Sequence, residues 1–185
     1  DITYYDMITT NQILAVQVSN ATGYNSMLIN AGEIENKGIE VQFNSKILQS
    51  KEGLNWNLTV NWAKNNNQVN ELYEDPQTGQ KLEAYQITSS WGGVTIEARP
   101  GRPFGVIRGN APLRDDNGNV IVGANGVPLR TAAPIEIGNI TPDWTGGIRN
   151  TFFYKGASLS FLVDVRMGGD VYSVSDWFGA YAGLT

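Results

Sequence analysis

The stretch Asn55-Trp56-Asn57-Leu58-Thr59-Val60-Asn61-Trp62 alternates strictly between polar and large apolar residues. Every even position in it is apolar, and every odd position is polar. Successive side chains of a β-strand point to opposite faces of the sheet, so this period predicts a strand with one apolar and one polar face. Trp56 and Trp62 stand at the two ends of the predicted apolar face.

A second alternating stretch, Ala157–Arg166, predicts another strand. The two faces of that strand carry different residues, apolar on one side (Leu159, Phe161, Val163, Val165) and polar on the other (Ser158, Ser160, Asp164, Arg166), with Leu162 as the exception. A turn at Lys155-Gly156 joins it to a preceding strand over Ile148–Tyr154. In a water-soluble sandwich such an apolar face packs against another sheet, whereas in a membrane barrel it contacts lipid. The alternation alone leaves both architectures open.

The connections between the predicted strands differ greatly in length. The pattern predicts strands over about 1–6, 38–45, 54–63, 144–154 and 157–167. Two connections, at about 7–37 and 64–143, contain roughly thirty and roughly eighty residues and far exceed the usual loop length. Short turns at one rim and long loops at the other are typical of outer-membrane β-barrels. We therefore predict an all-β fold, an antiparallel meander of about five strands that forms a slice of a transmembrane β-barrel.

The composition excludes several classes of protein. The 185 residues include no Cys and no His, and the formal net charge is −5. These values exclude a cationic nucleic-acid binder, catalysis by His, thiol chemistry and Cys/His metal sites. No apolar run approaches the roughly twenty residues of a membrane-spanning helix. The chain opens at Asp1 without a Met, so we expect it to be a piece of something larger.

Tight-turn signals punctuate the longer connection. Asp116-Asn117-Gly118-Asn119 and Asn125-Gly126 flank Val120-Ile121-Val122, which predicts a small hairpin or ladder inside the loop. No helix is strongly indicated, and the best candidate is a short turn around Val69–Glu74.

Two loop motifs are open to a ligand-binding interpretation. The spacing of Asp115, Asn117 and Asn119 fits the start of a calcium loop, but the bidentate Glu of such a loop is absent, so a hairpin turn is favoured. The segment 101–105 superficially resembles a phosphate loop, but no following helix offers its amino terminus. We interpret that segment as rigid loop structure.

A series of motifs follows one another along nearly the whole chain. They are Thr3-Tyr4-Tyr5, Gln12-Ile13-Leu14, Asn30–Glu40 (NAGEIENKGIE), Asn61–Asn65 (NWAKN), Val69 with Leu72-Tyr73, Gly101–Gly105 (GRPFG), Asp116-Asn117-Gly118, Gly138-Asn139, Pro142-Asp143-Trp144 and Arg166–Asp170 (RMGGD). This ordered set resembles the late-barrel region of the SusC-like TonB-dependent outer-membrane transporters. Residues 1–185 are thereby identified as part of a TonB-dependent receptor β-barrel domain whose plug and remaining barrel lie outside the chain.

The resemblance implies a function for the intact protein. It would be a plugged outer-membrane barrel of roughly twenty-two strands that imports an oligosaccharide or a peptide with energy delivered through TonB. The implied partners are a SusD-like surface lipoprotein, which caps the barrel, and the TonB complex, which engages the plug. This segment would supply barrel wall and extracellular binding or gating loops. The resemblance implies no enzymatic activity, cofactor, metal or nucleic-acid partner.

Within the Asn30–Glu40 motif, Gly32 and Gly38 are expected where the backbone turns or enters a bulge. Glu33 and Glu35 are expected to keep the base of the loop hydrated. A catalytic pairing of these carboxylates with Asp143 is not favoured, because glycoside hydrolysis requires two carboxyls at a set separation and nothing in the sequence places them together.

Aromatic residues in polar loop surroundings are candidates for contact with cargo. They are Tyr24, Tyr73, Tyr85, Trp91 and Phe104. Aromatic faces among Asn and Gln amides suit sugar rings or peptides. The alternative is that these side chains pack the large loop against itself. On the polar face of one strand, Asp164 and Arg166 are candidates for a polar pair inside the lumen, with a solvated surface pair as the alternative.

The competing interpretation of the whole chain is a free-standing soluble β-sandwich that binds glycan through its loops. It predicts that the apolar face of Trp56–Trp62 packs against that of Leu159–Val165. The transporter interpretation predicts that both faces point away from the chain and are buried by lipid, detergent or another copy. A five-stranded slice also leaves two open sheet edges, which predicts association through them.

Overall fold

The computed structural model describes residues 1–17, 26–30 and 32–184. The chain divides into two compact units, each assembled from three stretches of sequence. The sheet unit comprises Asp1–Ile8, Glu35–Asn67 and Pro142–Gly168. The loop unit comprises Thr9–Ile34, Gln68–Thr141 and Gly169–Thr185. Most of the two long predicted connections therefore belongs to a compact unit of its own.

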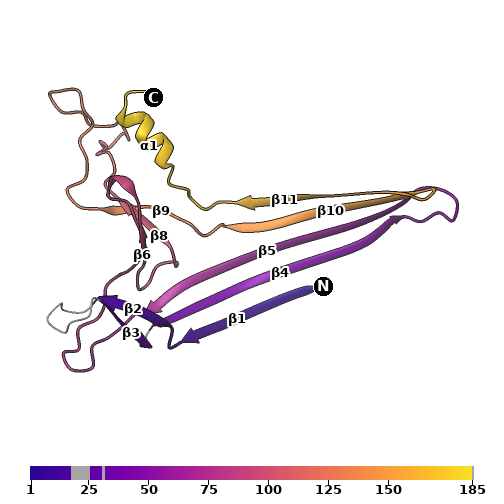
Figure 1. The fold of residues 1–185 in the computed structure, drawn as a ribbon, viewed down its shortest axis with the longest axis horizontal. Coiled ribbons are helices and arrows are strands. Elements are labelled where there is room, and N and C mark those ends of the chain that lie inside the picture. The colour runs from indigo at the N-terminus through magenta and orange to yellow at the C-terminus, as the bar shows by residue number, and fades with distance from the viewer. Residues whose placement is uncertain (18–25, 31, 185) are drawn as a thin grey trace. The chain divides into compact units, whose positions relative to one another are not determined.

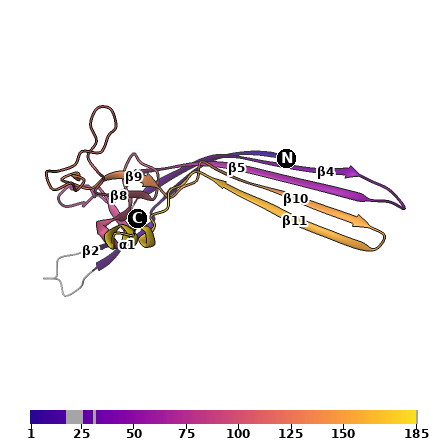
Figure 2. The ribbon, with the colours of Figure 1, turned by 90° about the horizontal axis from the view of Figure 1, so that it is seen from above.

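Five long strands form the principal sheet. Their order across the sheet is β1 (Ile2–Thr10), β4 (Glu33–Leu48), β5 (Asn55–Glu71), β10 (Trp144–Tyr154) and β11 (Ala157–Met167). The strands lie side by side, and successive strands run in opposite directions (Figure 1; Figure 2). The predicted all-β class and antiparallel meander are confirmed.

Strands β5, β10 and β11 share one continuous apolar face. Trp56 lies opposite Phe152, which in turn lies opposite Leu159. The ring centroids of Trp56 and Phe152 are 5.5 Å apart, and those of Phe152 and Phe161 are 6.2 Å apart. The indole Nε1 of Trp56 donates a hydrogen bond of 3.0 Å to Oδ1 of Asn150. These contacts form a cross-strand ladder of the kind that stabilises sheets.

The register decides how the two alternating stretches of the sequence are related. Because β5 and β11 flank β10, the apolar residues of Trp56–Trp62 and of Leu159–Val165 lie side by side on one face of one sheet. They do not pack face to face, so the packing predicted for a soluble sandwich is wrong. Leu159 remains 62% exposed and Val163 remains 50% exposed.

Gly38 differs from its predicted role in a turn or bulge. It lies inside β4, and a Cβ atom at this position would be 2.3 Å from the Tyr5 hydroxyl and 2.6 Å from the Lys64 carbonyl oxygen. Glycine is therefore required by the close approach of both neighbouring strands. Gly32, by contrast, has a φ of 91° just before β4 and does turn the backbone, as predicted.

Three strands extend beyond their predicted ends. Strand β1 continues to Thr10, β4 covers Glu33–Leu48, and β5 continues to Glu71, whereas β10 and β11 match their predicted bounds. The extension of β5 is rich in asparagine, a residue depleted in strands, so its pattern does not indicate one. Neighbouring backbone supplies the pairing, and Asn65 Nδ2 also donates a hydrogen bond of 3.0 Å to Asn36 Oδ1. The long connections are correspondingly shorter than 7–37 and 64–143.

The loop unit contains two small sheets. Strands β2 (Ile13–Gln17) and β3 (Ser26–Asn30) pair antiparallel. Strands β6 (Tyr85–Ser89), β7 (Thr95–Ala98), β8 (Val106–Gly109) and β9 (Ile135–Asn139) form a four-stranded sheet in sequence order. One core cluster of this unit consists of Val69, Leu72 and Ala98, against which Ile34, Leu82, Tyr85 and Phe104 pack. Val94, Val106 and Ile107 are also buried.

The predicted ladder within the loop is present between Pro112 and Arg130. Leu113, Ile121 and Leu129 hydrogen-bond to one another in a ring of three backbone contacts, at 2.7 to 2.9 Å. Gly118 and Gly126 lie at the tips of the two intervening turns, with φ of 84° and 76°. The prediction of a ladder with two tight glycine turns is confirmed.

The carboxylate of Asp115 organises the first of these turns. Its Oδ1 accepts backbone hydrogen bonds from Asn117 and Asn119, at 2.9 and 2.8 Å. The Asn119 side chain also donates to Asp115 Oδ2 at 3.0 Å, and this hydrogen bond, followed by the backbone ones, lowers the pKa of Asp115. The hairpin interpretation of this segment is confirmed. Among the residues with described positions, no cluster of three or more potential metal-ligating acids is found.

The helix α1 (Val174–Tyr181) was not predicted from the sequence. Its Ser173 cap accepts a hydrogen bond of 3.1 Å from the backbone N–H of Asp176, so a start signal was present in the sequence. The short 3-10 helix η2 covers Trp91–Gly93. The weak helical candidate at Val69–Glu74 instead begins within β5. In the part of the chain that the structure describes, no helix has the length and apolarity needed to span a membrane.

Candidate functional site

A cavity of about 240 Å³ lies in the loop unit. It is lined by residues from segments far apart in the sequence: Gln12, Ile13, Gly32, Ile34, Glu71, Leu72, Tyr85, Ile87, Ala98 and Phe104. Four of the motifs singled out in the sequence meet here, namely those containing Gln12, Ile34, Leu72 and Phe104. The cavity is therefore the place where separate loop motifs converge.

The GRPFG turn places Phe104 at the cavity. Val69 N–H donates to the Arg102 carbonyl at 2.9 Å, and Gly101 N–H donates to the Val69 carbonyl at 2.7 Å. This reciprocal pair ties the turn to the end of β5, where Val69 is fully buried. The Phe104 carbonyl also accepts from the Thr141 hydroxyl at 3.2 Å. Phe104 is thus held by hydrogen bonds from both sides, which supports the interpretation of this segment as structural.

Strand β6 supplies a second wall through an irregularity in its pairing. Tyr85 pairs with Ala98 on β7, but the register shifts between Gln86 and Thr88. The shift leaves Ile87 without a partner in the β6–β7 pairing, and both Tyr85 and Ile87 line the cavity. A bulge of this kind redirects a side chain without breaking the sheet.

The chemical character of the cavity is mainly apolar. Leu72 and Ala98 are buried at its base, and aromatic rings come from Tyr85 and Phe104. Polar side chains among the lining residues are limited to the amide of Gln12, the carboxylate of Glu71 and the hydroxyl of Tyr85. Such a site can bind an apolar group and orient it through a few polar contacts.

The predicted cargo residues fall at different places. Tyr85 and Phe104 line the cavity together, and they also pack against the loop-unit core. Tyr73 lies outside the cavity lining, where its carbonyl accepts from Leu82 N–H at 2.7 Å. Tyr24 lies outside the described residues. The role of all five aromatic residues in binding stays a prediction.

Trp91 belongs to a separate aromatic cluster formed by η2 and α1. Its ring centroid is 5.6 Å from that of Phe178, and its carbonyl accepts from the Tyr172 hydroxyl at 3.0 Å. The Trp177 ring stacks on Tyr181 at 5.6 Å. Trp91 remains 64% exposed, so part of its surface is available to a ligand.

Several cavity residues were not predicted from the sequence. Gln12, Ile13, Ile34, Glu71 and Ile87 were not identified as site residues, although the first three lie in motifs that carried the family resemblance. No local pattern shows that these positions share a cavity, because the lining comes from loop segments and strand ends. For Gln12, Ile13 and Ile34 the available signal was their membership of those motifs, and Glu71 and Ile87 had no such signal.

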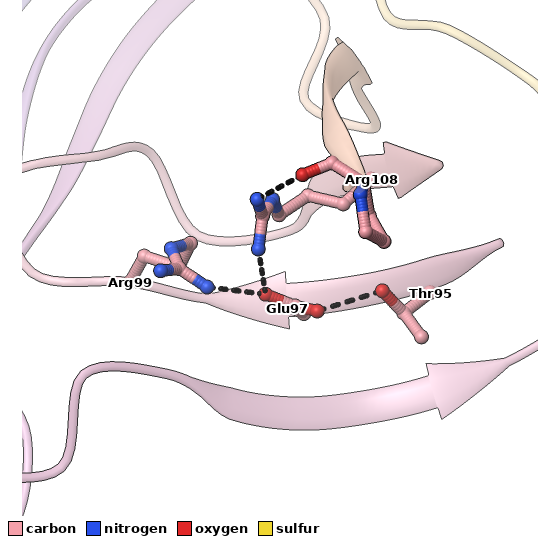
Figure 3. Close-up of polar contacts among 5 residues, drawn as sticks. Thr95, Glu97, Arg99 and Arg108 are labelled. Atoms are coloured by element: carbon pink, nitrogen blue, oxygen red, sulfur yellow. Dashed lines mark hydrogen bonds and ion pairs between the residues drawn. The ribbon is translucent and has the colours of Figure 1, made fainter. Parts of the chain in front are cut away.

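A charged cluster stabilises the sheet beside the cavity walls. Glu97 on β7 forms ion pairs with Arg99 at 2.8 Å and Arg108 at 3.7 Å, and it accepts from the Thr95 hydroxyl at 2.7 Å (Figure 3). Arg108 also donates to the Pro134 carbonyl, which ties β8 to the segment before β9. Burial raises the pKa of Glu97, but its hydrogen bonds and the two arginine charges outweigh burial and leave that pKa below the ordinary value.

Asp164 and Arg166 occupy the polar face of β11, as the alternation predicts. Asp164 lies opposite Gly147, and Arg166 lies opposite Thr145. A Cβ atom on Gly147 would be 2.7 Å from Asn61 Oδ1, 3.4 Å from Leu162 Cδ1 and 3.5 Å from Asp164 Oδ1, so side chains of both β5 and β11 cover this glycine. The assignment of Asp164 and Arg166 to a lumen stays a prediction.

Comparison with known proteins gives relatives for nearly the whole chain. TonB-dependent receptor P26 of Formosa agariphila is 26% identical over 194 aligned residues, which cover 94% of this chain and 19% of the relative. TonB-dependent receptor P3 of the same organism is also 26% identical and covers 91% of this chain and 18% of the relative. The chain resembles TonB-dependent receptors. The resemblance inferred from the ordered motifs is thereby confirmed.

Solved structures of the same kind share the fold. Two structures of RagAB, described as a peptide transporter and as a peptide importer in a "closed-closed" state, match with TM-scores of 0.63 and 0.65. The identity is 20% in both, and the matches cover 88% and 91% of this chain. No family model matches the chain. The relatives are receptors and transporters rather than enzymes, as the resemblance implied, and the chain spans about a fifth of their length.

Proposed function

We propose that this chain is part of an outer-membrane TonB-dependent transporter that imports oligosaccharides or peptides. The single observation that carries the proposal is the apolar face shared by β5, β10 and β11, which is half-buried on β5 and most exposed along β11. On this face Leu159 remains 62% exposed and Val163 remains 50% exposed. A continuous exposed apolar sheet face requires a partner, and lipid is the partner in a membrane barrel.

The opposite face of the sheet supports a lumen. It carries Asn61, Asp164 and Arg166, which a lipid environment would disfavour. In a transmembrane barrel, lipid-facing apolar side chains alternate with polar side chains that face the interior. We therefore assign the polar side of this sheet to the barrel interior and its apolar side to the bilayer.

The loop unit would supply the surface that binds cargo. Its cavity is bounded by Tyr85 and Phe104, and the exposed Trp91 ring lies in the aromatic cluster of η2 and α1. Long loops of outer-membrane barrels lie on the extracellular side, where cargo first meets the transporter. The aromatic rings suit contact with sugar rings or with peptide side chains.

Two partners complete the proposed assembly. A SusD-like surface lipoprotein would cap the barrel over the loops, and the TonB complex would engage a plug in the remainder of the protein. The relatives' names support the dependence on TonB, and RagAB, a peptide importer, supports import of peptides by a protein of this fold. This segment would contribute barrel wall and binding or gating loops.

The proposed function is tested with the full-length protein in its own cells. Membrane fractions are probed with an antibody against residues 74–100, and cargo uptake is compared between cells with and without TonB. We expect a protein several times longer than this chain in the outer-membrane fraction, and uptake that is lost without TonB. A soluble protein of this chain's own length would overturn the proposal.

A further inference from the structure

We propose that the loop-unit cavity binds a single apolar side chain of a peptide cargo, next to a cationic group of the same peptide. This inference rests on the proposed import function and narrows its cargo from oligosaccharides or peptides to peptides. It rests on the volume of the cavity and on the polarity and charge of the residues that line it.

The size of the cavity fits one side chain rather than a longer stretch of cargo. Its volume is about 240 Å³, whereas pockets for whole drug-sized ligands span roughly 300–1,000 Å³. A cavity of roughly 150 Å³ already accommodates a benzene ring. A phenylalanine or leucine side chain can therefore enter, while the rest of the peptide stays outside.

The lining disfavours a sugar ring in the same place. Seven of its residues offer no side-chain polar group: Ile13, Gly32, Ile34, Leu72, Ile87, Ala98 and Phe104. A monosaccharide carries several hydroxyls, and each hydroxyl buried without a partner costs about 1–3 kcal/mol. Gln12, Glu71 and Tyr85 are too few to satisfy them, whereas an apolar side chain requires no such partner.

The charge of the lining favours a cation beside the apolar group. Glu71 is exposed, and it is the one acidic side chain among the residues that line this cavity, which include no Lys or Arg. A carboxylate next to an apolar pocket attracts a lysine, an arginine or a free amino terminus of a bound peptide. An anionic group in the same position would meet repulsion and no counter-charge.

The walls are organised before any ligand arrives. Phe104 is fixed by the hydrogen bonds of its turn to Val69, and Leu72 and Ala98 are buried in the core beneath it. Ile87 is directed to the cavity by the bulge in β6. A preorganised site loses less conformational entropy on binding than a site that must be ordered by its ligand.

The apolar pocket is tested with a substitution that fills it with a larger side chain. We would prepare the full-length transporter with Ile87→Trp, and with Ile137→Trp as the matched control. Both isoleucines are partly exposed strand residues of the loop unit, at 38% and 42%, but only Ile87 lines the cavity. Binding of the peptides Gly-Phe-Lys-Gly and Gly-Ser-Lys-Gly is measured by calorimetry. Because burial of one such side chain contributes roughly 1.5–3 kcal/mol, the unaltered transporter should prefer the Phe peptide by about tenfold or more.

The test of the charge uses a change that preserves shape. Glu71→Gln is compared with Glu83→Gln, an exposed glutamate outside the cavity lining. The probes are Gly-Phe-Lys-Gly and Gly-Phe-Gln-Gly, which differ only in the cation. We expect Glu71→Gln to abolish a preference of about two- to fivefold for the lysine peptide, the range of an exposed ion pair. Glu83→Gln should leave that preference intact.

The outcomes separate this inference from the proposed function. The inference is supported if Ile87→Trp lowers Phe-peptide affinity to the Ser-peptide level while Ile137→Trp does not. It is overturned if the Phe peptide binds Ile87→Trp normally, or if the transporter binds a linear oligosaccharide and none of the peptides. In both overturning cases, TonB-dependent uptake in the outer membrane would still uphold the proposed function. Loss of that uptake would overturn both.

Discussion

At the scale of single residues, the neighbours of Gly38 leave no room at this position for a side chain, not even for one methyl group. A Cβ atom there would be 2.3 Å from the Tyr5 hydroxyl and 2.6 Å from the Lys64 carbonyl oxygen. Both distances are shorter than real contacts, and the second involves backbone, which cannot rotate away. The sequence predicted a structural role for Gly38, but only the sheet order shows that its neighbours lie on β1 and β5.

We predict that Gly38→Ala lowers the free energy of unfolding of the full-length protein by about 1–3 kcal/mol, as expected for overpacking. Urea unfolding measured by tryptophan fluorescence checks this value. Tyr5→Ala in the same background removes the ring contact but leaves the Lys64 carbonyl in place, so it should restore stability only in part. An unchanged unfolding midpoint for Gly38→Ala would contradict the close packing of β1, β4 and β5.

Glu97 accepts hydrogen bonds from Thr95 and Arg99 and forms an ion pair with Arg108 on β8, and its side chain is only 13% exposed. We predict that Glu97→Gln destabilises the four-stranded sheet by roughly 1–2 kcal/mol, since charge-assisted hydrogen bonds are lost. Hydrogen–deuterium exchange of the β7 and β8 amides should become faster in this variant. The exposed Glu83→Gln serves as the control and should leave these rates unchanged.

The same carboxylate gives a pH dependence with a definite sign. Its pKa in the folded protein lies below the unfolded value of 4.5, so it stabilises the fold fully above pH 4.5. This contribution is lost as the pH falls through the lower folded-state pKa. The difference in exchange rates between Glu97→Gln and the unaltered protein should therefore shrink as the medium is acidified below that value. A difference that grows on acidification would show that the paired form of Glu97 is not the ionised one.

At the scale of elements, β11 allows its two faces to be compared at adjacent positions. Val163 belongs to the apolar face and Leu162 to the polar face, and the two are 50% and 53% exposed. We predict that Val163→Arg reduces insertion into the outer membrane, because arginine on the lipid face costs roughly 2–4 kcal/mol at the bilayer midplane. Leu162→Arg should be tolerated. The measurement is the amount of heat-modifiable barrel in outer-membrane fractions, and equal amounts for both variants would contradict the proposed lipid face.

The ladder of Pro112–Arg130 was predicted from its turn residues alone, because glycine at a positive φ is a local requirement. Gly126 has a φ of 76° and open space around its Cβ position, so only backbone strain opposes a side chain there. We predict that Gly126→Val destabilises this turn by roughly 1–2 kcal/mol, with faster exchange at the Leu129 amide. The neighbouring Ala124→Val, at a position without a positive φ, is the control and should not change that rate.

At the scale of the whole molecule, the principal sheet ends in β1 on one side and β11 on the other. The outer edges of these two strands have no neighbouring strand among the described residues, and the apolar face carries exposed side chains such as Leu159 at 62% and Val163 at 50%. We predict that the 185-residue chain, produced alone without detergent, self-associates through these edges. Light scattering coupled to size-exclusion chromatography gives its mass. A monodisperse monomer would show that the edges and the face are covered in some other way.

Local sequence was sufficient to predict the strands whose alternation is clear, the turn at Lys155-Gly156 and the glycine turns of the ladder. These are consequences of side-chain period and backbone conformation, and they need no distant neighbour. The sequence also carried the family resemblance through motifs in a fixed order. The asparagine-rich end of β5 was not predicted as a strand, because its pairing depends on the adjacent backbone rather than on the strand propensity of its own residues.

Which segments meet depended on the tertiary structure alone. The register of β5, β10 and β11 placed two apolar stretches on one face of one sheet, and so excluded their face-to-face packing. The same holds for the cavity, where Gln12, Ile34 and Phe104 come together although they lie far apart in the sequence. The physical reason is that non-local contacts depend on strand order and loop closure, which no local pattern of side chains encodes.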